Sequence, residues 1–171
     1  MLRLPGFKSQ SITDYIGTTP VFDIRTHLNG PLISEGMIYG PTGKVVSRFV
    51  ADMHGSWSGA TGRLQENFVY ASGLRQDREW RLTESNDGSI VADADDLVGQ
   101  GYGRAEGCAF QMKYKIRLPE DAGGHVLSVV DWMYLVDNGT ILNRSQMRKF
   151  GVKVAELVAT MRPAQADQIA A

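Results

Sequence analysis

Two charged residues interrupt the apolar faces of neighbouring segments near the middle of the sequence. In RLQENFVY, Glu66 alternates with apolar and aromatic side chains, and in REWRL, Arg78 shares its face with Trp80. A three-residue loop that ends at Gly73 would place Glu66 directly opposite Arg78 in a hairpin. Because an unpaired charge is costly to bury, the two side chains are predicted to form an inward ion pair. Such a pair would either fix the register of the strands or grip the head group of a ligand.

A second group of polar and aromatic side chains lies in VLSVVDWMYLVDNGTILNRSQM, residues 126–147. Its centre, Asn138-Gly139, is a strong signal for a β-hairpin with a two-residue type I′ loop. That loop would set Tyr134 opposite Asn143 on one face of the strand pair. The spacing therefore predicts both the hairpin and its register.

The two faces of this hairpin carry different side chains. The more apolar face, which includes Trp132 and Tyr134, is predicted to point into the protein. Asp131 and Arg144 would then form a pair at the surface or rim, where ion pairs contribute little to stability. With the faces reversed, Asp131 and Arg144 would form a second internal pair.

Other residue types that could perform chemistry lack the spacing that chemistry needs. His27, His54 and His125 show no metal-ligand spacing, and Cys108 is the only cysteine in the sequence, which excludes an internal disulfide. The glycine-rich stretch before Cys108 has Glu106 where a dinucleotide-binding motif needs its last glycine. No metal site and no cofactor are predicted.

The pattern around these residues predicts an all-β fold. From residue 21 onward, apolar side chains mostly alternate with polar ones, beginning with VFDIRTHL, and short turns separate the segments. We predict an up-and-down antiparallel β-barrel of about 8–10 strands. A short helical turn is expected near Tyr15, and the last strand is expected to pass into a short C-terminal helix. The predicted divisions are an N-terminal lead-in (1–20), the barrel (21–162) and a flexible tail (163–171).

A barrel with this number of strands can enclose a pocket for one small ligand. The apolar strand faces predict the side chains that would line it. These are Phe49, Met53, Trp57, Phe68, Tyr70, Trp80, Phe110, Met112, Tyr114, Trp132 and Tyr134.

Composition narrows the class of protein. The 171 residues carry a formal net charge of −1 with no basic run, which argues against nucleic-acid binding. No stretch approaches the roughly 18 apolar residues of a membrane span. The N-terminal residues also lack the apolar core of a secretory signal and a lipidation cysteine, so a cytoplasmic location is expected.

Several phrases together resemble a bacterial family catalogued as a domain of unknown function, number 3833. They are GSWSGATGRLQENFVYASG, REWRL, VVDWMYLVDNGTILNR and KFG. The resemblance implies a lipocalin-like, calycin-type barrel and, because members look associated with fatty-acid modification, a lipid ligand. Many members begin with a lipoprotein signal, from which this chain departs. The positions that match the family pattern are Arg48, Glu66, Phe68, Arg78, Trp80, Tyr114, Asp131, Trp132, Asn143 and Arg144.

Three functions follow from these observations. The first is binding of a hydrophobic small molecule, such as a fatty acid, whose carboxylate would meet Arg78 beside Glu66. The second is a lipid-modifying isomerase or cyclase, with Glu66 or Asp131 as acid or base and Tyr114 or Tyr134 as proton donor or oxyanion stabiliser. The third is a barrel with a packed core that serves a structural or interaction role. The ligand-binding set for the first is Arg48, Glu66, Phe68, Arg78, Trp80, Tyr114, Trp132, Tyr134, Asn143 and Arg144, and a homodimer is left open.

Overall fold

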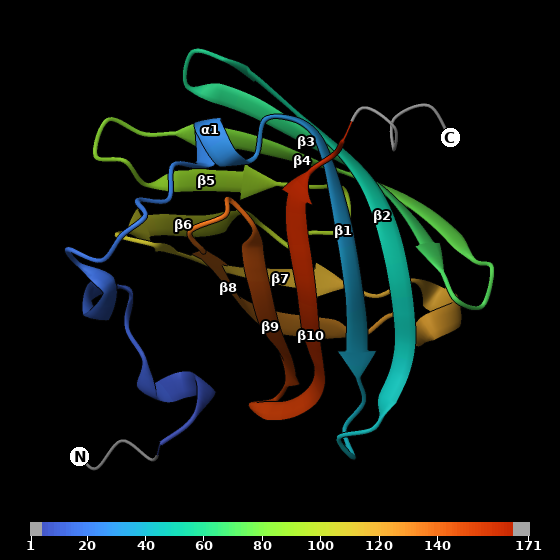
Figure 1. Cartoon of the computed structure of the whole chain (residues 1–171). Helices are drawn as coiled ribbons and strands as arrows, with labels where there is room; N and C mark the ends of the chain where they lie inside the picture. Colours follow the sequence, from blue (N-terminus) through green and yellow to red (C-terminus); the bar gives the residue numbers. More distant parts are fainter. Residues whose placement is uncertain (1–4, 166–171) are drawn as a thin grey trace.

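Ten antiparallel strands close into a single barrel in the computed structural model, which describes residues 5–165 (Figure 1). Each strand pairs with its neighbours in sequence, and β1 also pairs with β10 to close the sheet. The strands are β1 (Gly30–Tyr39), β2 (Val45–Ser58), β3 (Thr61–Tyr70), β4 (Arg75–Glu84), β5 (Ile90–Asp93), β6 (Gly101–Glu106), β7 (Ala109–Arg117), β8 (Val126–Leu135), β9 (Ile141–Lys149) and β10 (Val152–Pro163). The predicted up-and-down barrel is confirmed.

Alternation of buried and exposed side chains explains why these segments form a closed sheet. In β2, Phe49, Ala51 and Met53 are buried in the barrel, whereas Arg48 and Val50 are exposed on the outer face. Burying one face of every strand removes apolar surface from water, and closure leaves no unpaired edge along most of the sheet.

Glycines let the backbone approach large side chains inside the barrel. A Cβ at Gly36 would collide with the ring of Phe49 on the neighbouring strand, and one at Gly103 would lie 2.5 Å from Cζ of Phe110. Part of the glycine-rich stretch before Cys108 forms β6. Its glycines leave room for the ring of Phe110 on the neighbouring strand.

A short helix lies where the alternation predicted a first strand. Residues 21–28 contain α1 (Ile24–His27), which begins where the Asp23 side chain accepts a hydrogen bond from the Arg25 backbone N–H at 2.9 Å. Ile24 and Leu28, one helical turn apart, are both buried in the main core. The strand prediction is wrong here, because the same apolar spacing also fits a helical turn with a capping aspartate.

The hairpin at Asn138-Gly139 has a longer loop than predicted. Val136 and Thr140 face each other across it, with Val136 N–H donating to Thr140 O at 3.0 Å. Gly139 adopts φ +81°, but Asn138 does not adopt the positive φ that a type I′ loop requires. The result is a three-residue loop, and the extra residue shifts the predicted register by one.

This shift reverses the predicted faces of β8, whereas β9 keeps its predicted inner face. Met133 pairs with Asn143, Asp131 pairs with Ser145, and all four side chains lie on the inner face. Trp132 points outward, contrary to the prediction, although it is only 1% exposed.

An N-terminal segment covers the outer face of β8 and explains this burial. It contains the 3₁₀ turns η1 (Phe7–Ser9) and η2 (Ile12–Tyr15), which confirm a short helical turn near Tyr15, and it runs outside the barrel beside β8 and β9 (Figure 1). The rings of Trp132 and Tyr134 lie 5.7 and 5.6 Å from that of Tyr15. Gln10 Oε1 accepts hydrogen bonds from the hydroxyls of both tyrosines. Aromatic side chains predicted for the lumen therefore form a second, smaller core outside it.

The chain ends in a strand. β10 continues to Pro163, and Ala164 N–H still donates to Pro31 O at 3.0 Å, so the expected C-terminal helix does not form in the described residues. Residues 166–171 of the predicted tail lie outside the described part. A third 3₁₀ turn, η3 (Glu120–Ala122), lies between β7 and β8. Among residues 5–165, none of the helices has the length and apolar character to cross a membrane.

Candidate functional site

The interior of the barrel contains a cavity of ≈ 130 Å³. A cavity of ~150 Å³ with apolar walls is large enough to hold benzene, so the space here suits a molecule of about six carbon atoms. Of the predicted wall residues, Phe49, Met53, Phe68, Trp80, Phe110, Met112 and Tyr114 line it. Trp57 and Tyr70 instead pack against the core next to the cavity.

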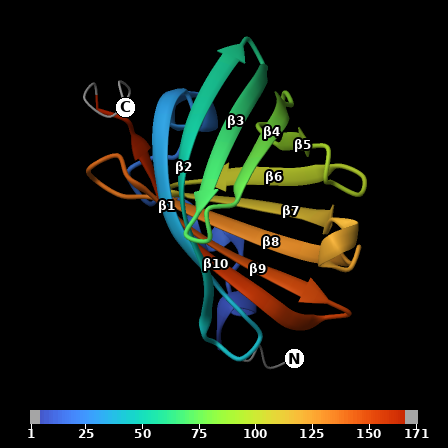
Figure 2. The ribbon, with the colours of Figure 1, turned by 90° about the vertical axis from the view of Figure 1, so that its right-hand side faces the viewer.

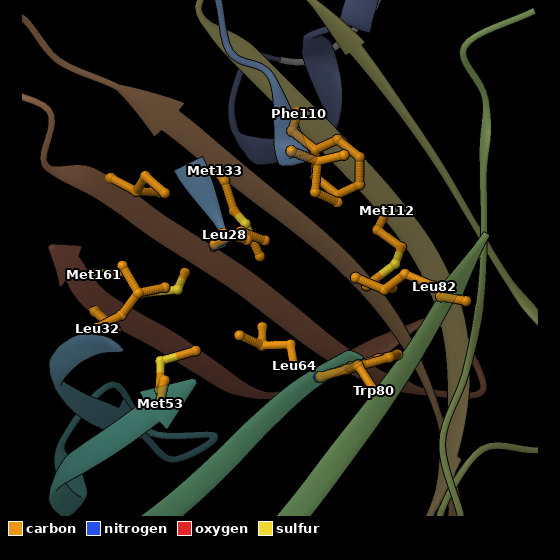
Figure 3. Close-up of a cluster of buried hydrophobic side chains, with 14 of the residues drawn as sticks. Leu28, Leu32, Met53, Leu64, Trp80, Leu82, Phe110, Met112, Met133 and Met161 are labelled. Atoms are coloured by element: carbon orange, nitrogen blue, oxygen red, sulfur yellow. The ribbon is translucent and has the colours of Figure 1, made fainter. Parts of the chain in front are cut away.

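Methionines make up much of the apolar wall. Met53, Met112, Met133, Met147 and Met161 all line the cavity, and Figure 3 shows four of them projecting into the barrel interior. Methionine side chains are unbranched and change conformation readily. The cavity can therefore change its shape around an occupant at low cost.

Polar side chains line another part of the same cavity. They come from strands all around the barrel: Ser34, Glu66, Arg78, Tyr114, Asp131, Asn143 and Ser145. Polar groups in an apolar cavity orient a ligand and give specificity. This set unites both hairpins that the sequence singled out.

Asp131 is held by three hydrogen-bond donors. Its Oδ1 accepts from Asn143 Nδ2 and from Ser145 Oγ at 2.6 Å, and Tyr114 donates to Oδ2 over a long 3.5 Å. Asn143 also donates to the backbone carbonyl of Trp132 at 2.8 Å. Burial raises the pKa of Asp131, and the hydrogen bonds from Ser145 and Asn143 oppose that rise.

Glu66 lies opposite Arg78 in the β3–β4 ladder, as predicted. The predicted direct ion pair is absent from the described residues, because the Arg78 guanidinium donates from Nε and Nη2 to Asp96 Oδ1, at 3.1 and 2.9 Å. The guanidinium also lies over the ring of Trp80, 4.1 Å from its centroid. Arg78 thus has other partners in place of Glu66.

Glu66 is buried and incompletely satisfied. Its side chain is 9% exposed, and Oε2 has no hydrogen-bond partner. Burial raises the pKa of Glu66 to about 7, since the opposing effect of Arg78 is weaker and the charges of Asp131 and Asp96 raise it further. Near neutral pH this carboxyl group can either accept or donate a proton.

Asp96 reaches Arg78 because the barrel wall is incomplete there. β5 has four residues and pairs with Arg81–Glu84 of β4, so residues 75–80 have no ladder partner on that side within the described chain (Figure 2). The following loop crosses to β7, where Arg117 N–H donates to Asp96 O at 2.8 Å. The sequence pattern does not predict the contact between Arg78 and Asp96, because this contact depends on how early β5 ends.

The Arg78–Asp96 pair also separates the cavity from the outside. Arg78 lines both the internal cavity and a surface groove of ≈ 460 Å³. The groove is otherwise polar, with walls formed by Gln65, Asn67, Gln76, Asp77, Glu79, Asp95 and Asp96.

Four other predicted site residues lie outside the barrel. Trp132 and Tyr134 pack under the N-terminal segment, so their predicted place in the lumen wall is wrong. Arg144 pairs with Glu156 at 2.7 Å on the outer face, and Arg48 is exposed on the outer face of β2. The one-residue register shift explains Trp132 and Tyr134, because it turns these β8 side chains outward, whereas β9 keeps its predicted face, with Asn143 inside and Arg144 outside.

The sequence of the chain matches one known protein family. A family model described as "Protein of unknown function (DUF3833)" matches residues 1–163. The chain belongs to this family. No curated protein matches the sequence.

The cavity of this DUF3833 domain has two chemical capabilities. Its apolar wall can hold a hydrocarbon group, while Glu66 and Arg78 offer an acceptor and a cation to a polar group. Within residues 5–165, histidine, cysteine and acidic side chains form no group of three or more that could hold a metal ion. In this DUF3833 chain, the side chains on the cavity wall can bind a ligand non-covalently and exchange a proton with it.

Proposed function

We propose that the barrel binds a small amphipathic, lipid-like molecule, with its hydrocarbon part among the methionines and its polar part beside Glu66 and Arg78. The observation that carries this proposal is the unpaired Glu66 Oε2 at an internal cavity of ≈ 130 Å³. A buried polar atom without a partner is unfavourable, and a ligand that supplies the partner removes that cost. A packed structural core would have neither the space nor the unpaired acceptor.

The size of the cavity limits the occupant. It suits a chain of about six carbons, and a longer chain needs the methionine side chains to rearrange. A fatty acid of ordinary length would therefore enter only with such a rearrangement. A six-carbon amphiphile is the appropriate first probe.

Methyl NMR of the full chain tests this proposal with a control built into the sequence. The protein is labelled at methionine methyl carbons and titrated with 1-hexanol. We expect the methyl signals of Met53, Met112, Met133 and Met161 to shift with a dissociation constant on the order of 1 mM. Met37 lies on the outer face of β1 and should not respond.

The opposite pattern would overturn the proposal. If hexanol leaves the lumen methionines unchanged, or shifts Met37 alone, the cavity does not bind amphiphiles. An Arg81→Ala variant is a matched control for Arg78→Ala, because Arg81 lies on the same strand and pairs with Asp93 away from the cavity. Weaker binding in Arg78→Ala but not in Arg81→Ala assigns the polar end.

A second candidate function is proton transfer catalysed by Glu66. The rise of its pKa to about 7 supports this, because an acid–base group works best when its pKa is near the ambient pH. Asp131 is less suited to this role, since both of its oxygens already accept hydrogen bonds.

Isotope exchange distinguishes catalysis from simple binding. In D₂O, a Glu66 base would remove protons next to the carbonyl of bound 2-hexanone, and mass spectrometry would detect the deuterium that replaces them. We expect exchange faster than in buffer for the wild type and not for Glu66→Gln. Equal rates in the two proteins would exclude this role for Glu66.

A further inference from the structure

We infer that the polar end of the cavity selects a cationic hydrogen-bond donor, such as a primary ammonium group, over the carboxylate of a fatty acid. This inference rests on the proposed binding function and names the class of head group. It is carried by the arrangement of charges around Glu66 and by the unpaired acceptor of this cavity-lining residue.

Acidic groups outnumber basic ones at this end of the cavity. Among the described residues, two carboxylates, Glu66 and Asp131, and one guanidinium, that of Arg78, line the cavity, and a third carboxylate, Asp96, meets Arg78 from the outer groove. The guanidinium is already paired with Asp96 through two hydrogen bonds. When Glu66 and Asp131 are ionised, they leave the cavity wall with a negative charge that Arg78 does not balance.

An added anion would increase this negative charge inside a poorly hydrated space. A carboxylate could meet the free N–H groups of Arg78 only by sharing its single positive charge with Asp96, which this charge already balances. Repulsion between like charges is strong where water is excluded. The fatty-acid carboxylate expected from the sequence is therefore the less suitable head group.

A cation has the opposite effect. Glu66 Oε2 is a buried acceptor that lacks a donor, and an ammonium group carries three N–H donors and one positive charge. Placed beside Oε2, the ammonium would complete the hydrogen bonding of Glu66 and balance its charge. A neutral hydroxyl would supply the hydrogen bond but not the charge.

The other groups near Glu66 do not change this balance. Tyr70 and Tyr114 are the phenols that interact with it, and burial raises the pKa of both, so they stay neutral. The remaining titratable neighbours are the three already counted, Arg78, Asp96 and Asp131. Lowering the pH would protonate Glu66 and weaken the preference for a cation.

Three probes with the same six-carbon chain isolate the effect of the head group. Hexylamine, 1-hexanol and hexanoate are titrated at pH 7.5 against the full chain labelled at methionine methyl carbons. We expect hexylamine to bind at least tenfold more tightly than hexanoate, with hexanol between them. In Glu66→Gln, hexylamine should lose this advantage and approach the affinity of hexanol.

The outcomes separate this inference from the proposed function. If hexanoate binds as tightly as hexylamine, or if Glu66→Gln leaves the order unchanged, the head-group assignment is wrong although the cavity still binds. If none of the three probes shifts the lumen methionines, the proposed function itself fails. Glu79→Gln serves as the matched control, since Glu79 lies on β4 outside the lumen and pairs with Arg63.

A second readout would not respond to a purely structural role of Glu66. An ammonium beside Oε2 should lower the pKa of Glu66, because a nearby cation favours the ionised carboxylate. Carboxyl carbon NMR with and without hexylamine measures this directly. A pKa unchanged by saturating hexylamine would place the amine elsewhere and overturn the inference.

Discussion

Two buried carboxylates face the same cavity from opposite walls of the barrel, yet their surroundings differ. Glu66 on β3 and Asp131 on β8 are separated by four strands in either direction around the sheet, β4–β7 on one side and β9, β10, β1 and β2 on the other. Asp131 accepts hydrogen bonds from three side chains, whereas Oε2 of Glu66 has no partner. Burial alone is therefore not what distinguishes them.

This difference in hydrogen bonding indicates that Asp131 has a structural role, whereas Glu66 is available to a ligand. Asp131 links β7, β8 and β9 through its donors, so its charge is used to hold the wall together. Glu66 is also buried, but its Oε2 accepts no hydrogen bond. A group kept in an unfavourable state at a cavity is a candidate for function.

Removal of Asp131 should therefore have the largest effect on stability. Asp131→Ala removes the acceptor of Ser145 and Tyr114 and one of the two acceptors of Asn143, and each unsatisfied buried donor is unfavourable. We expect the free energy of unfolding to fall by about 4 kcal/mol, measured by urea denaturation at pH 7. A loss no greater than that of Glu66→Gln under the same conditions would show that the two carboxylates are equivalent.

Glu66 should instead appear in the dependence of stability on pH. Burial raises the pKa of Glu66 from its ordinary 4.5 to about 7 in the folded chain, so the folded state holds this proton more tightly than the unfolded state. The resulting stabilisation is complete below about pH 4 and is lost as the pH rises through 7, about 3 kcal/mol in all.

Glu66→Gln removes this dependence because glutamine has no proton to release. Urea denaturation from pH 4 to pH 8 should show the wild type losing stability relative to Glu66→Gln, with the midpoint of the difference between pH 4.5 and pH 7. Parallel curves for the two proteins would mean that Glu66 titrates normally. That result would remove the contrast with Asp131.

The half of the site around Glu66 was predictable because it depends on local turn chemistry. Tyr70 and Leu74 bound a three-residue loop, in which Gly73 adopts φ +87° and sets the register. Glu66 and Arg78 then lie opposite each other by counting alone. Their different partners were not predictable, because Asp96 arrives from a loop that follows a short strand.

In the half around Asp131, β8 was predicted with the wrong face inward, although the inner face of β9 was predicted correctly. Asn138-Gly139 is compatible with a two-residue loop and with a three-residue loop that ends in a left-handed glycine, and these differ by one residue in register. Apolar content could not correct the error, since Trp132 is nearly fully buried on the outside by the N-terminal segment. When both faces of a strand are buried, as in β8, the apolar content of the faces does not indicate which one lines the lumen.

A smaller change in the donors to Asp131 would make its surroundings more like those of Glu66. Ser145→Ala removes the 2.6 Å hydrogen bond to Oδ1 and leaves those of Asn143 and Tyr114 in place. We expect a loss of about 1.5 kcal/mol in the free energy of unfolding, together with a further rise in the pKa of Asp131, because that hydrogen bond favours the ionised form. Carboxyl carbon NMR follows the titration of Asp131 directly. A fall in its pKa, or no change, would mean that Ser145 does not hold the charged form and that the two carboxylates differ for some reason other than their donors.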